Sequence, residues 1–374
     1  MKAAVRKITA YGIFVCMLSL AALLVFSDKK DFSENENRYL AKMPALTWEA
    51  VRSGEYMDGI NDYLADHFPF RDAFVGARTA ALKTLGKREV NGIFLIDDGS
   101  LIEDYAAPQN TERIGRIFKS FADKLDGRAE VHLMLVPTAV YVNSDKLPAD
   151  APVRNQMDTA RRLYEMTGIA PIDCSGLLLQ SRDKGELYYR TDHHWTTLGA
   201  YVGYQAFCGE MGFEAEPLSE WKAETVTQDF FGTLYSKAND YSLDGDSITI
   251  YTRPDDCLSV NYVDTGVVTD SLYNLEYLEK KDKYSLFLDN LHPLIEVTNE
   301  NVKNGRALVL VKDSYANSIV PFLAHHYERI YVFDTRYYKK GVAAFVEGLD
   351  CEVDVVLVYN MNTIDGDLGV GGVY

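Results

Sequence analysis

Hydrophobic residues form two kinds of pattern that alternate over residues 92–212 and 306–359. Continuous apolar runs of strand length stand at GIFLI (92–96), VHLMLVP (131–137), APID (170–173), RALVLVK (306–312), RIYVFD (329–334) and VDVVLVY (353–359). Apolar residues at helical spacing stand between them, over residues 110–125, 155–166, 197–212, 316–327 and 341–349. Such alternation is typical of a mostly parallel sheet with helices on both faces. The pattern predicts a three-layer α/β domain over residues 89–374.

Residues 213–300 lack this alternation. Their apolar runs are shorter and more polar, and they stand at DSITIYTR (246–253), SVNYVDTGVVT (259–269) and YSLFLD (284–289). Short runs bounded by Asp, Asn and Gly are typical of edge strands and hairpins. We therefore predict a β-rich insertion at about residues 213–300 of the α/β domain.

The first 27 residues combine a basic start with an uncharged apolar stretch, Ala10 to Phe26. These 17 residues would form a helix about 26 Å long, close to the ~30 Å of a bilayer core and longer than the ~7–15 apolar residues of a cleaved signal. We expect an uncleaved signal-anchor that leaves the rest of the chain outside the cytoplasm. The alternative is a cleaved signal and a secreted protein. Residues 28–88 follow as a lead-in strap, with a helix predicted over residues 51–66.

The charge balance argues against a nucleic-acid partner. The chain has 38 lysine and arginine residues against 55 aspartate and glutamate residues, a net charge of −17, and such a surface repels phosphate backbones. Four cysteines follow the apolar segment without forming a C-x-x-C pair, namely Cys174, Cys208, Cys257 and Cys351. This spacing does not support a zinc knuckle, and it leaves disulfides and free thiols equally open.

A serine stands at the carboxyl end of one predicted strand. RALVLVK runs into Asp313-Ser314-Tyr315 and then into a predicted helix, and catalytic groups of open parallel sheets lie at the carboxyl ends of strands. The turn would aim the Ser314 hydroxyl outward, and the N–H groups at the helix start, Tyr315 first, could stabilise an oxyanion. Lys312 and Ala316 occupy the glycine positions of a G-x-S-x-G elbow, which disfavours an α/β-hydrolase proper.

A second polar cluster, Asp192-His193-His194-Trp195, precedes the helix predicted from residue 197. A serine hydroxyl is a good nucleophile only when a base removes its proton and an acid orients that base. In an extended segment, residues two apart project to the same side. Asp192 could therefore orient His194 as the base, while His193 points elsewhere and Trp195 forms a packing wall.

Each of these features also has a structural interpretation. An Asp-Ser turn at a strand end is commonly a helix cap, and an Asp-x-His pair is commonly a local hydrogen-bonding device. A metal site is a third hypothesis, but adjacent histidines such as His193 and His194 seldom reach one ion together, in contrast to the i, i+4 spacing of H-E-x-x-H. We expect no metal and no cofactor.

The sequence resembles the DHHW protein family, whose name is the motif at residues 192–195, and more distantly the SGNH-like alginate O-acetyltransferases of bacterial envelopes. The blocks that carry the resemblance are SENENRYL (33–40), DHFPFRD (66–72), NGIFLI (91–96), TDHHWTTLGAY (191–201), FFGTLYSK (230–237), LDNLHPLI (288–295), KDSYANS (312–318) and DTRYY (334–338). The fold that the resemblance implies is flavodoxin-like and SGNH-hydrolase-like, in agreement with the alternation of strands and helices.

The acetyltransferase resemblance implies a triad of Ser314, His194 and Asp192. Ser314 would take an acetyl group from a donor and pass it to a saccharide hydroxyl or to water. His194 would shuttle the proton, and Asp192 would fix the tautomer of His194. Further residues that could line the site or donate to an oxyanion are Tyr315, Arg336, Asn290, Thr138, His193 and Trp195.

On this basis we expect an extracytoplasmic carbohydrate O-acetyltransferase or acetylesterase that acts on cell-surface polysaccharide. The resemblance further suggests a membrane partner that exports acetyl groups. The alternative from a different class is a non-catalytic glycan-binding or scaffold protein of the cell envelope, for which 25 tyrosine and 17 phenylalanine residues would supply rings that stack on sugars.

Overall fold

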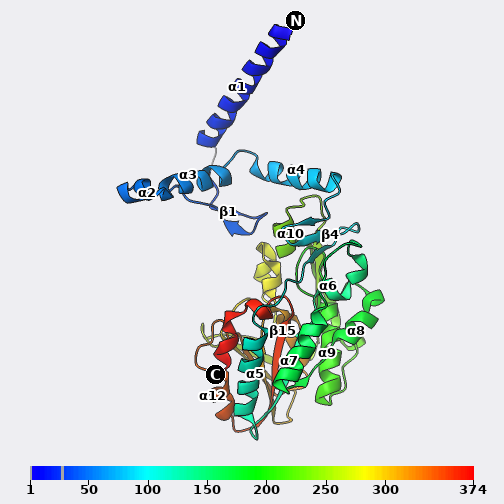
Figure 1. Ribbon diagram of the computed structural model, residues 1–374. Coiled ribbons are helices and arrows are strands. Elements are labelled where there is room, and N and C mark those ends of the chain that lie inside the picture. Colours follow the sequence, from blue (N-terminus) through cyan, green and yellow to red (C-terminus); the bar gives the residue numbers. More distant parts are fainter. Residues whose placement is uncertain (1, 27–28) are drawn as a thin grey trace. The chain divides into compact units, whose positions relative to one another are not determined.

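The computed structural model describes residues 2–26 and 29–374. The chain forms two compact units (Figure 1). One holds the residues up to Val90 together with Tyr235–Ser242, and the other holds Asn91–Leu234 and Leu243–Tyr374. The second unit contains the central sheet and carries the site residues predicted from the sequence.

The first unit begins with the apolar helix α1 (Lys2–Phe26). Its stretch Ala4–Phe26 has 23 residues with a mean hydropathy of 2.3 and is long enough to cross a membrane. By composition and position it is either a membrane anchor or a signal sequence.

Helices and short strands make up the rest of this unit. They are β1 (Phe32–Ser33), β2 (Arg38–Tyr39), α2 (Trp48–Ser53), α3 (Glu55–Asp66), α4 (Arg71–Thr84) and β3 (Glu89–Val90). The helix predicted over residues 51–66 is thus two helices. Gly54 separates them because its φ of 91° is a left-handed conformation that ends α2.

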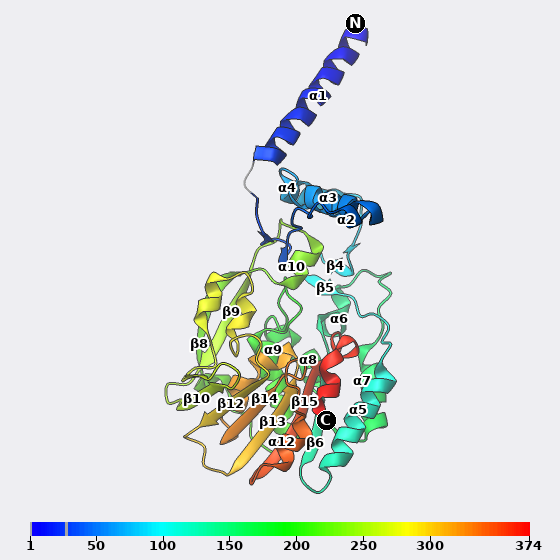
Figure 2. The ribbon, with the colours of Figure 1, turned by 90° about the vertical axis from the view of Figure 1, so that its left-hand side faces the viewer.

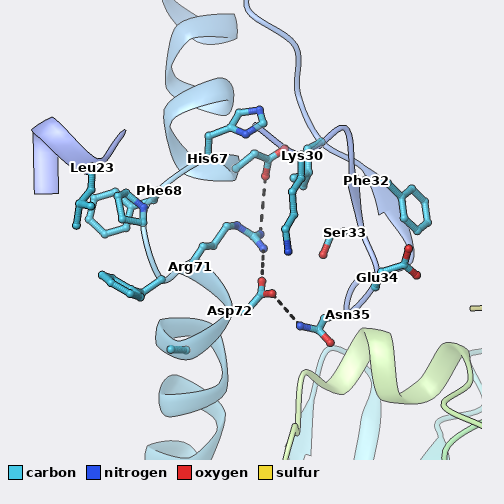
Figure 3. Close-up of a pocket in the computed structure, with 15 residues that line it drawn as sticks. Leu23, Lys30, Phe32, Ser33, Glu34, Asn35, His67, Phe68, Arg71 and Asp72 are labelled. Carbon is cyan, nitrogen blue, oxygen red and sulfur yellow. Dashed lines mark hydrogen bonds and ion pairs between the residues drawn. The ribbon is translucent and has the colours of Figure 1, made fainter. Parts of the chain in front are cut away.

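Polar contacts tie the segment after α1 to the junction of α3 and α4 (Figure 3). Asp72 accepts a hydrogen bond of 2.8 Å from Asn35, and Arg71 lies 3.8 Å from Asp66. Arg71 also donates to Glu36 at 2.8 Å. These contacts between residues far apart in the sequence give the unit an internal polar framework.

The second unit is built on an eight-stranded sheet with the order β11-β10-β12-β14-β13-β15-β6-β7 (Figure 2). The strands are β6 (Glu130–Val136), β7 (Ala170–Pro171), β10 (Leu258–Tyr262), β11 (Val267–Thr269), β12 (Leu294–Asn299), β13 (Arg306–Lys312), β14 (Arg329–Phe333) and β15 (Glu352–Asn360). β14, β13, β15, β6 and β7 pair in parallel, and β12, β10 and β11 continue antiparallel from β14. The prediction of a mostly parallel sheet is confirmed.

Helices cover both faces of this sheet (Figure 2). They are α5 (Thr111–Leu125), α6 (Ala139–Val142), α7 (Gln156–Thr167), α8 (Ser175–Gln180), α9 (Thr197–Met211), α11 (Val320–Leu323) and α12 (Val342–Glu347). α5 contacts α7 and α12, whereas α9 contacts α8 and α11. Crossover connections between parallel strands are right-handed. The connections β6–α7–β7 and β14–α12–β15 cross the sheet in one direction, and β13–α11–β14 crosses it in the opposite direction. Therefore α7 and α12 lie on one face of the sheet and α11 lies on the other.

Part of the chain before β6 lies outside the main sheet. GIFLI was expected as a strand of the α/β pattern, but β4 (Ile93–Leu95) pairs antiparallel with β5 (Leu101–Glu103) instead. In the insertion, β8 (Lys222–Phe230) and β9 (Asp246–Thr252) form a two-stranded sheet, with α10 (Thr233–Ala238) between them. Only the hairpin β10–β11 and β12 join the central sheet.

Two predicted elements take a different form. YSLFLD is not a strand but begins with a 3₁₀ turn, η5 (Lys283–Leu286), and then Leu288, Asp289 and Asn290 all have positive φ, which a strand cannot accommodate. The helix predicted over residues 316–327 is a 3₁₀ turn, η6 (Ser314–Ser318), followed by the four-residue α11, because Pro321 lacks the N–H that a continuous helix requires. All five cysteines are free thiols.

Candidate active site

Ser314 begins the turn η6 directly after β13. The turn is fixed by the buried Asp313. One of its carboxylate oxygens accepts from the Tyr315 N–H at 2.9 Å, and the other accepts from the backbone and side-chain N–H groups of Asn360 and from the Thr363 hydroxyl at 2.7–2.8 Å. Asn360 ends β15, so Asp313 ties the turn that carries Ser314 to the neighbouring strand.

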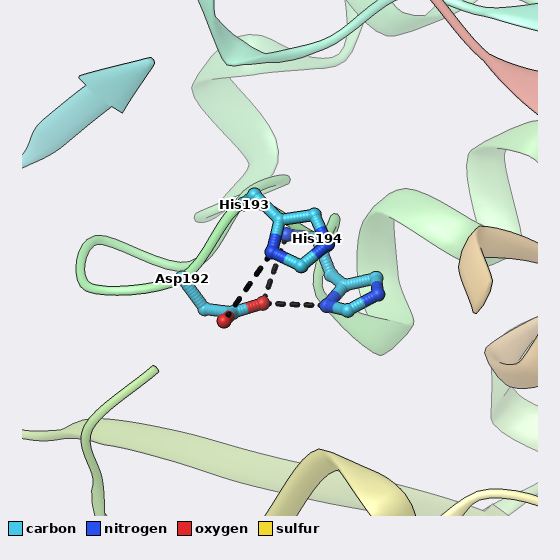
Figure 4. A group of neighbouring side chains, drawn as sticks. All are labelled: Asp192, His193 and His194. Carbon is cyan, nitrogen blue, oxygen red and sulfur yellow. Dashed lines mark hydrogen bonds and ion pairs between the residues drawn. The ribbon is translucent and has the colours of Figure 1, made fainter. Parts of the chain in front are cut away.

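Asp192 and His194 lie in the segment before α9 and contact each other through their side chains (Figure 4). Asp192 Oδ1 accepts hydrogen bonds from the backbone N–H of His194 at 3.0 Å and from His194 Nδ1 at 2.5 Å. An ionised carboxylate can only accept, so Nδ1 carries the imidazole proton. This tautomer leaves the lone pair of a neutral imidazole on Nε2.

The second ring nitrogen of His194 faces Ser314. His194 Nε2 lies 2.8 Å from Ser314 Oγ, and the tautomer makes the serine hydroxyl the donor. The two residues are 120 positions apart in the sequence. Ser314, His194 and Asp192 therefore form one hydrogen-bonded series at the carboxyl end of β13.

The second oxygen of Asp192 is held by the start of α10. Asp192 Oδ2 accepts from Thr233 N at 2.8 Å and from Thr233 Oγ1 at 3.2 Å. A Cβ atom at Gly232 would lie 2.2 Å from this carboxylate, so only glycine allows the chain to approach so closely. Asp192 is thus bonded on both of its oxygens.

Burial and the neighbouring charges together determine the protonation of the pair. Burial is the main cause that lowers the pKa of His194 to about 4, and the nearby His193 acts in the same direction. For Asp192, burial opposes ionisation, but the two histidines and their hydrogen bonds lower its pKa well below the usual value. At neutral pH the pair is therefore a carboxylate beside a neutral imidazole.

Aromatic rings enclose His194. Tyr284 from η5 stacks on its imidazole, with ring centroids 3.7 Å apart and an angle of 9° between the planes. His193 was expected to point elsewhere, but its ring lies 3.9 Å from that of His194 and its Nδ1 lies 2.6 Å from Thr233 Oγ1. Trp195 is fully buried and donates from Nε1 to the carbonyl of Tyr315 at 2.9 Å.

The backbone N–H of Tyr315, predicted as an oxyanion donor, already has a hydrogen-bond partner. The Tyr315 N–H was expected to be free, but it is bonded to Asp313 Oδ1. The Tyr315 hydroxyl donates to the carbonyl of His193. The sequence could not show this, because any aspartate before a turn can either cap its N–H groups or leave them open.

Three further candidates have other partners. Thr138 is buried, and its N–H and hydroxyl bond Gln156 and Asn362; it lines a cavity of about 10 Å³ with His193. The Arg336 guanidinium bonds Asp334 through Nε at 2.9 Å and Nη2 at 2.5 Å. Asn290 is in the left-handed segment after η5 and bonds Tyr277. Among the described residues, none of the three shares a hydrogen bond with Ser314 or His194.

The ligand atoms of Asp192, His193 and His194 all lie within 4.8 Å of one another. A group of this kind could hold a metal ion. However, each ring nitrogen of His194 already has a side-chain partner, Asp192 on one side and Ser314 on the other. We therefore interpret the group as a hydrogen-bonded cluster and assign no metal ligands.

Sequence reasoning missed the residues that support the series. Thr233 and Gly232 lie in the block FFGTLYSK, which carries part of the family resemblance, and this was the available signal. Tyr284 lies in a run interpreted as a strand, and nothing in the local pattern pointed to it.

The DHHW protein family model matches residues 92–333. Among solved structures, a DHHW family protein from Eubacterium siraeum is 26% identical with a TM-score of 0.67, and the match covers 76% of this chain and 95% of that chain. Bacillus cereus PatB1 with a sulfonyl adduct is 22% identical with a TM-score of 0.62, covering 74% and 97%. The O-acetyltransferase domain of Pseudomonas putida AlgJ is 14% identical with a TM-score of 0.45, covering 74% and 93%. A search of curated proteins finds no match.

The family match extends over more than half of the chain and includes both the Asp192-His193-His194-Trp195 motif and Ser314. The structure from Eubacterium siraeum shares the fold over nearly its whole length. On these grounds the chain belongs to the DHHW protein family.

Proposed function

We propose that this chain is an extracytoplasmic enzyme that transfers or hydrolyses acetyl esters of cell-surface polysaccharide. Ser314 is the nucleophile, His194 the general base and acid, and Asp192 the group that orients His194. The observation that carries the proposal is the pair of consecutive hydrogen bonds, 2.8 Å from Ser314 Oγ to His194 Nε2 and 2.5 Å from His194 Nδ1 to Asp192 Oδ1. Acyl transfer by a serine requires a nucleophile, a base and an orienting acid within hydrogen-bond distance of one another.

In the first half-reaction, Ser314 Oγ attacks the carbonyl carbon of the acetyl donor while its proton passes to His194 Nε2. The tetrahedral intermediate collapses when the bond to the leaving oxygen breaks and His194 returns the proton to that oxygen. Asp192 keeps the other imidazole proton on Nδ1 and stabilises the transient imidazolium. We assign the Ser314 N–H as an oxyanion donor, because the next N–H, that of Tyr315, is bonded to Asp313.

In the second half-reaction, an acceptor hydroxyl attacks the acetyl-serine. His194 takes the proton of this hydroxyl, and the Ser314 oxygen leaves with a proton returned from His194. A sugar hydroxyl as acceptor gives transfer, and water gives hydrolysis. The same residues serve both outcomes.

Three observations support the assignment to acetyl chemistry at the cell envelope. The sequence resembles the alginate O-acetyltransferases of bacterial envelopes, though more distantly than it resembles the DHHW family. PatB1, which shares the fold, was obtained with a sulfonyl adduct, and sulfonyl groups attach covalently to nucleophilic side chains. The apolar helix α1 is suited to hold the chain at a membrane, with the remainder outside the cytoplasm.

A fluorophosphonate probe tests the nucleophile. We expect the wild-type protein to be labelled at Ser314, Ser314→Ala to be unlabelled, and His194→Ala to be labelled at least about 100-fold more slowly, because the hydroxyl loses its base. The exposed Ser144→Ala serves as the matched control and is expected to label like wild type. Equal labelling of wild type and Ser314→Ala contradicts the proposal.

Acetate release from an acetylated chromogenic ester tests the reaction. Release that depends on Ser314 and His194 and continues in the presence of a strong chelator supports the proposal. Glycan binding that survives both Ser314→Ala and His194→Ala, with no acetate released by wild type, would instead favour a non-catalytic binding protein.

A further inference from the structure

Tyr284 contacts both His194 and the turn that carries Ser314. It lies in η5 of the insertion and is 4% exposed. Its ring stacks on His194 at 3.7 Å, and its hydroxyl donates to the backbone carbonyl of Ser314 at 3.1 Å. The hydroxyl also lies 3.2 Å from Ser318 Oγ, within the same turn. One side chain therefore joins the two segments that meet in the 2.8 Å contact between His194 and Ser314.

The imidazole of His194 is restrained on both faces and at both nitrogens. Two rings with centroids within 4 Å of the same imidazole cannot share one face without overlapping, so Tyr284 and His193 lie on opposite faces. Asp192 and Ser314 bond the ring nitrogens. Of these four restraints, only Tyr284 comes from a segment that is far from both the motif and the serine in the sequence.

The Tyr284 side chain is itself held in place by neighbouring aromatic rings. Its ring lies edge-on to Tyr189, with centroids 6.3 Å apart, and 5.0 Å from Phe287. These residues belong to a second apolar cluster, made by the insertion together with the segment before the motif. A ring held in this way can fix a neighbour, because its own rotation is blocked.

We propose that Tyr284 is a positioning residue for His194, and this inference rests on the proposed function. Its ring keeps the imidazole in the plane that aims Nε2 at Ser314 Oγ, and its hydroxyl adds a weaker tie to the Ser314 backbone. The electron-rich face of the phenol also favours the imidazolium that forms when His194 accepts the serine proton. Tyr284 itself exchanges no proton and forms no covalent bond in the reaction.

Two substitutions separate the ring from the hydroxyl. Tyr284→Phe keeps the stacked ring and loses the hydrogen bond to Ser314, whereas Tyr284→Leu loses the ring and keeps much of the volume. Tyr273→Leu is the matched control. Tyr273, like Tyr284, packs on Phe287 and donates its hydroxyl to a carbonyl, that of Tyr251, but it does not contact His194. Thermal melting shows whether each variant is folded.

The readout is the proton NMR signal of His194 Nδ1–H in the full chain. A proton in an imidazole–carboxylate bond of 2.5 Å resonates far downfield of ordinary N–H signals, and its loss in Asp192→Asn assigns it. We expect the signal to persist in Tyr284→Phe and Tyr273→Leu and to broaden beyond detection in folded Tyr284→Leu. An unchanged signal in folded Tyr284→Leu overturns the inference, as does its loss in folded Tyr273→Leu.

Kinetics on the acetylated ester give the second readout. We expect Tyr284→Leu to lower kcat by about tenfold or more with KM changed by less than about twofold, and Tyr284→Phe to keep most of kcat, because misplaced catalytic groups slow the chemical step more than they weaken binding. A kcat loss that is equal in the two Tyr284 variants overturns the role of the ring. If wild type shows no turnover that depends on Ser314, the proposed function fails, and the NMR comparison still decides whether Tyr284 positions His194.

Discussion

The protonation state of His194 sets how the proposed activity should depend on pH. Burial lowers the pKa of this imidazole to about 4, and a general base must be neutral to accept the serine proton. We expect kcat/KM on an acetylated ester to stay constant as the pH falls from 8 to about 5 and to drop as the pH passes through about 4. An exposed histidine would lose its activity near a pKa of about 6.5.

The same measurement needs a control for unfolding. The pKa of His194 is lower in the folded protein than in the unfolded chain, so the unfolded chain binds more protons between about pH 6.5 and about pH 4. The free energy of unfolding therefore falls as the pH is lowered through this range. Circular dichroism at each pH separates unfolding from protonation of the folded protein. A half-point of kcat/KM at pH 6–7 in a fully folded protein contradicts the assignment of a buried neutral base.

Thr233 is the neighbour of Asp192 whose hydroxyl can be removed while its backbone bond remains. Thr233→Val deletes the contact of Oγ1 with Asp192 Oδ2 and with His193 Nδ1, while the N–H to Oδ2 bond is kept. We expect kcat/KM to fall by about tenfold, since a lost hydrogen bond to a charged group costs about 1.5–3 kcal/mol. Steady-state kinetics check this.

Two variants define what the Thr233 result means. Thr233→Ser keeps the hydroxyl and should retain activity within about threefold of wild type. Thr225→Val, at an exposed position of β8, makes the same chemical change away from Asp192 and should leave the kinetics unaltered. A Thr233→Val variant as active as wild type would mean that the backbone bond alone orients the carboxylate.

The pattern of hydrophobic residues correctly predicts those strands and helices whose buried residues recur at a regular spacing along the chain. β13, β14 and β15 are continuous apolar runs because both of their faces are covered, and α5 has its buried residues at helical spacing. The contact of Asp192 with His194 was predicted for an extended segment, but residues 191–194 form a bend in which Asp192 Oδ1 accepts from both the backbone N–H and the Nδ1 of His194. The carboxyl end of β13 made Ser314 a candidate, and the catalytic roles of the three residues remain predictions.

The pattern of hydrophobic residues does not predict elements whose conformation depends on contacts with distant residues or on the φ angle of one residue. η5 carries Tyr284 into contact with His194, 90 positions away in the sequence, and no local period encodes that approach. The left-handed residues after η5 cannot be inferred from apolar spacing. The apolar pattern alone predicts one longer helix over residues 316–327. The hydrogen bond of Asp313 to the Tyr315 N–H and the missing N–H of Pro321 instead produce the short turn η6 followed by α11.

The link between β13 and β15 through Asp313 gives a prediction for the stability of the second unit. Asp313→Asn places an amide N–H₂ where the carboxylate accepts hydrogen bonds from Tyr315, Asn360 and Thr363. Buried donors are then left without acceptors, at about 1–3 kcal/mol each before relaxation. We expect the free energy of unfolding to fall by about 2–4 kcal/mol in urea titrations.

The labelling rate of Ser314 should fall together with the stability of Asp313→Asn, because the same turn holds the serine in place. Asp123→Asn is the matched control. Asp123 pairs with Lys119 on the exposed side of α5 at 2.9 Å, and exposed pairs of this kind contribute about 0–1 kcal/mol. Equal stabilities of the two variants would show that the Asp313 bonds are replaced by other contacts.

At the scale of the whole molecule, we propose that α1 is kept as a membrane anchor. Ala4–Phe26 has 23 residues, about 35 Å of helix, which exceeds a bilayer core of ~30 Å. Arg6 and Lys7 stand near its start, and basic residues before a span favour the cytoplasmic side. Under the proposed function, an anchored chain would act on polymer at the outer face of the membrane.

We therefore expect the full chain to stay in the membrane pellet after extraction with alkaline carbonate and to enter solution only with detergent. Leu18→Arg should weaken this retention, because an arginine at the centre of a span costs about 2.5–3.5 kcal/mol. Protease added to spheroplasts should digest the chain, because the proposed orientation of α1 leaves the second unit outside the cytoplasm. Mass spectrometry of the mature protein is decisive: a soluble product that begins after residue 26 means that α1 is a cleaved signal, and the protein would then diffuse away from the membrane rather than act beside it.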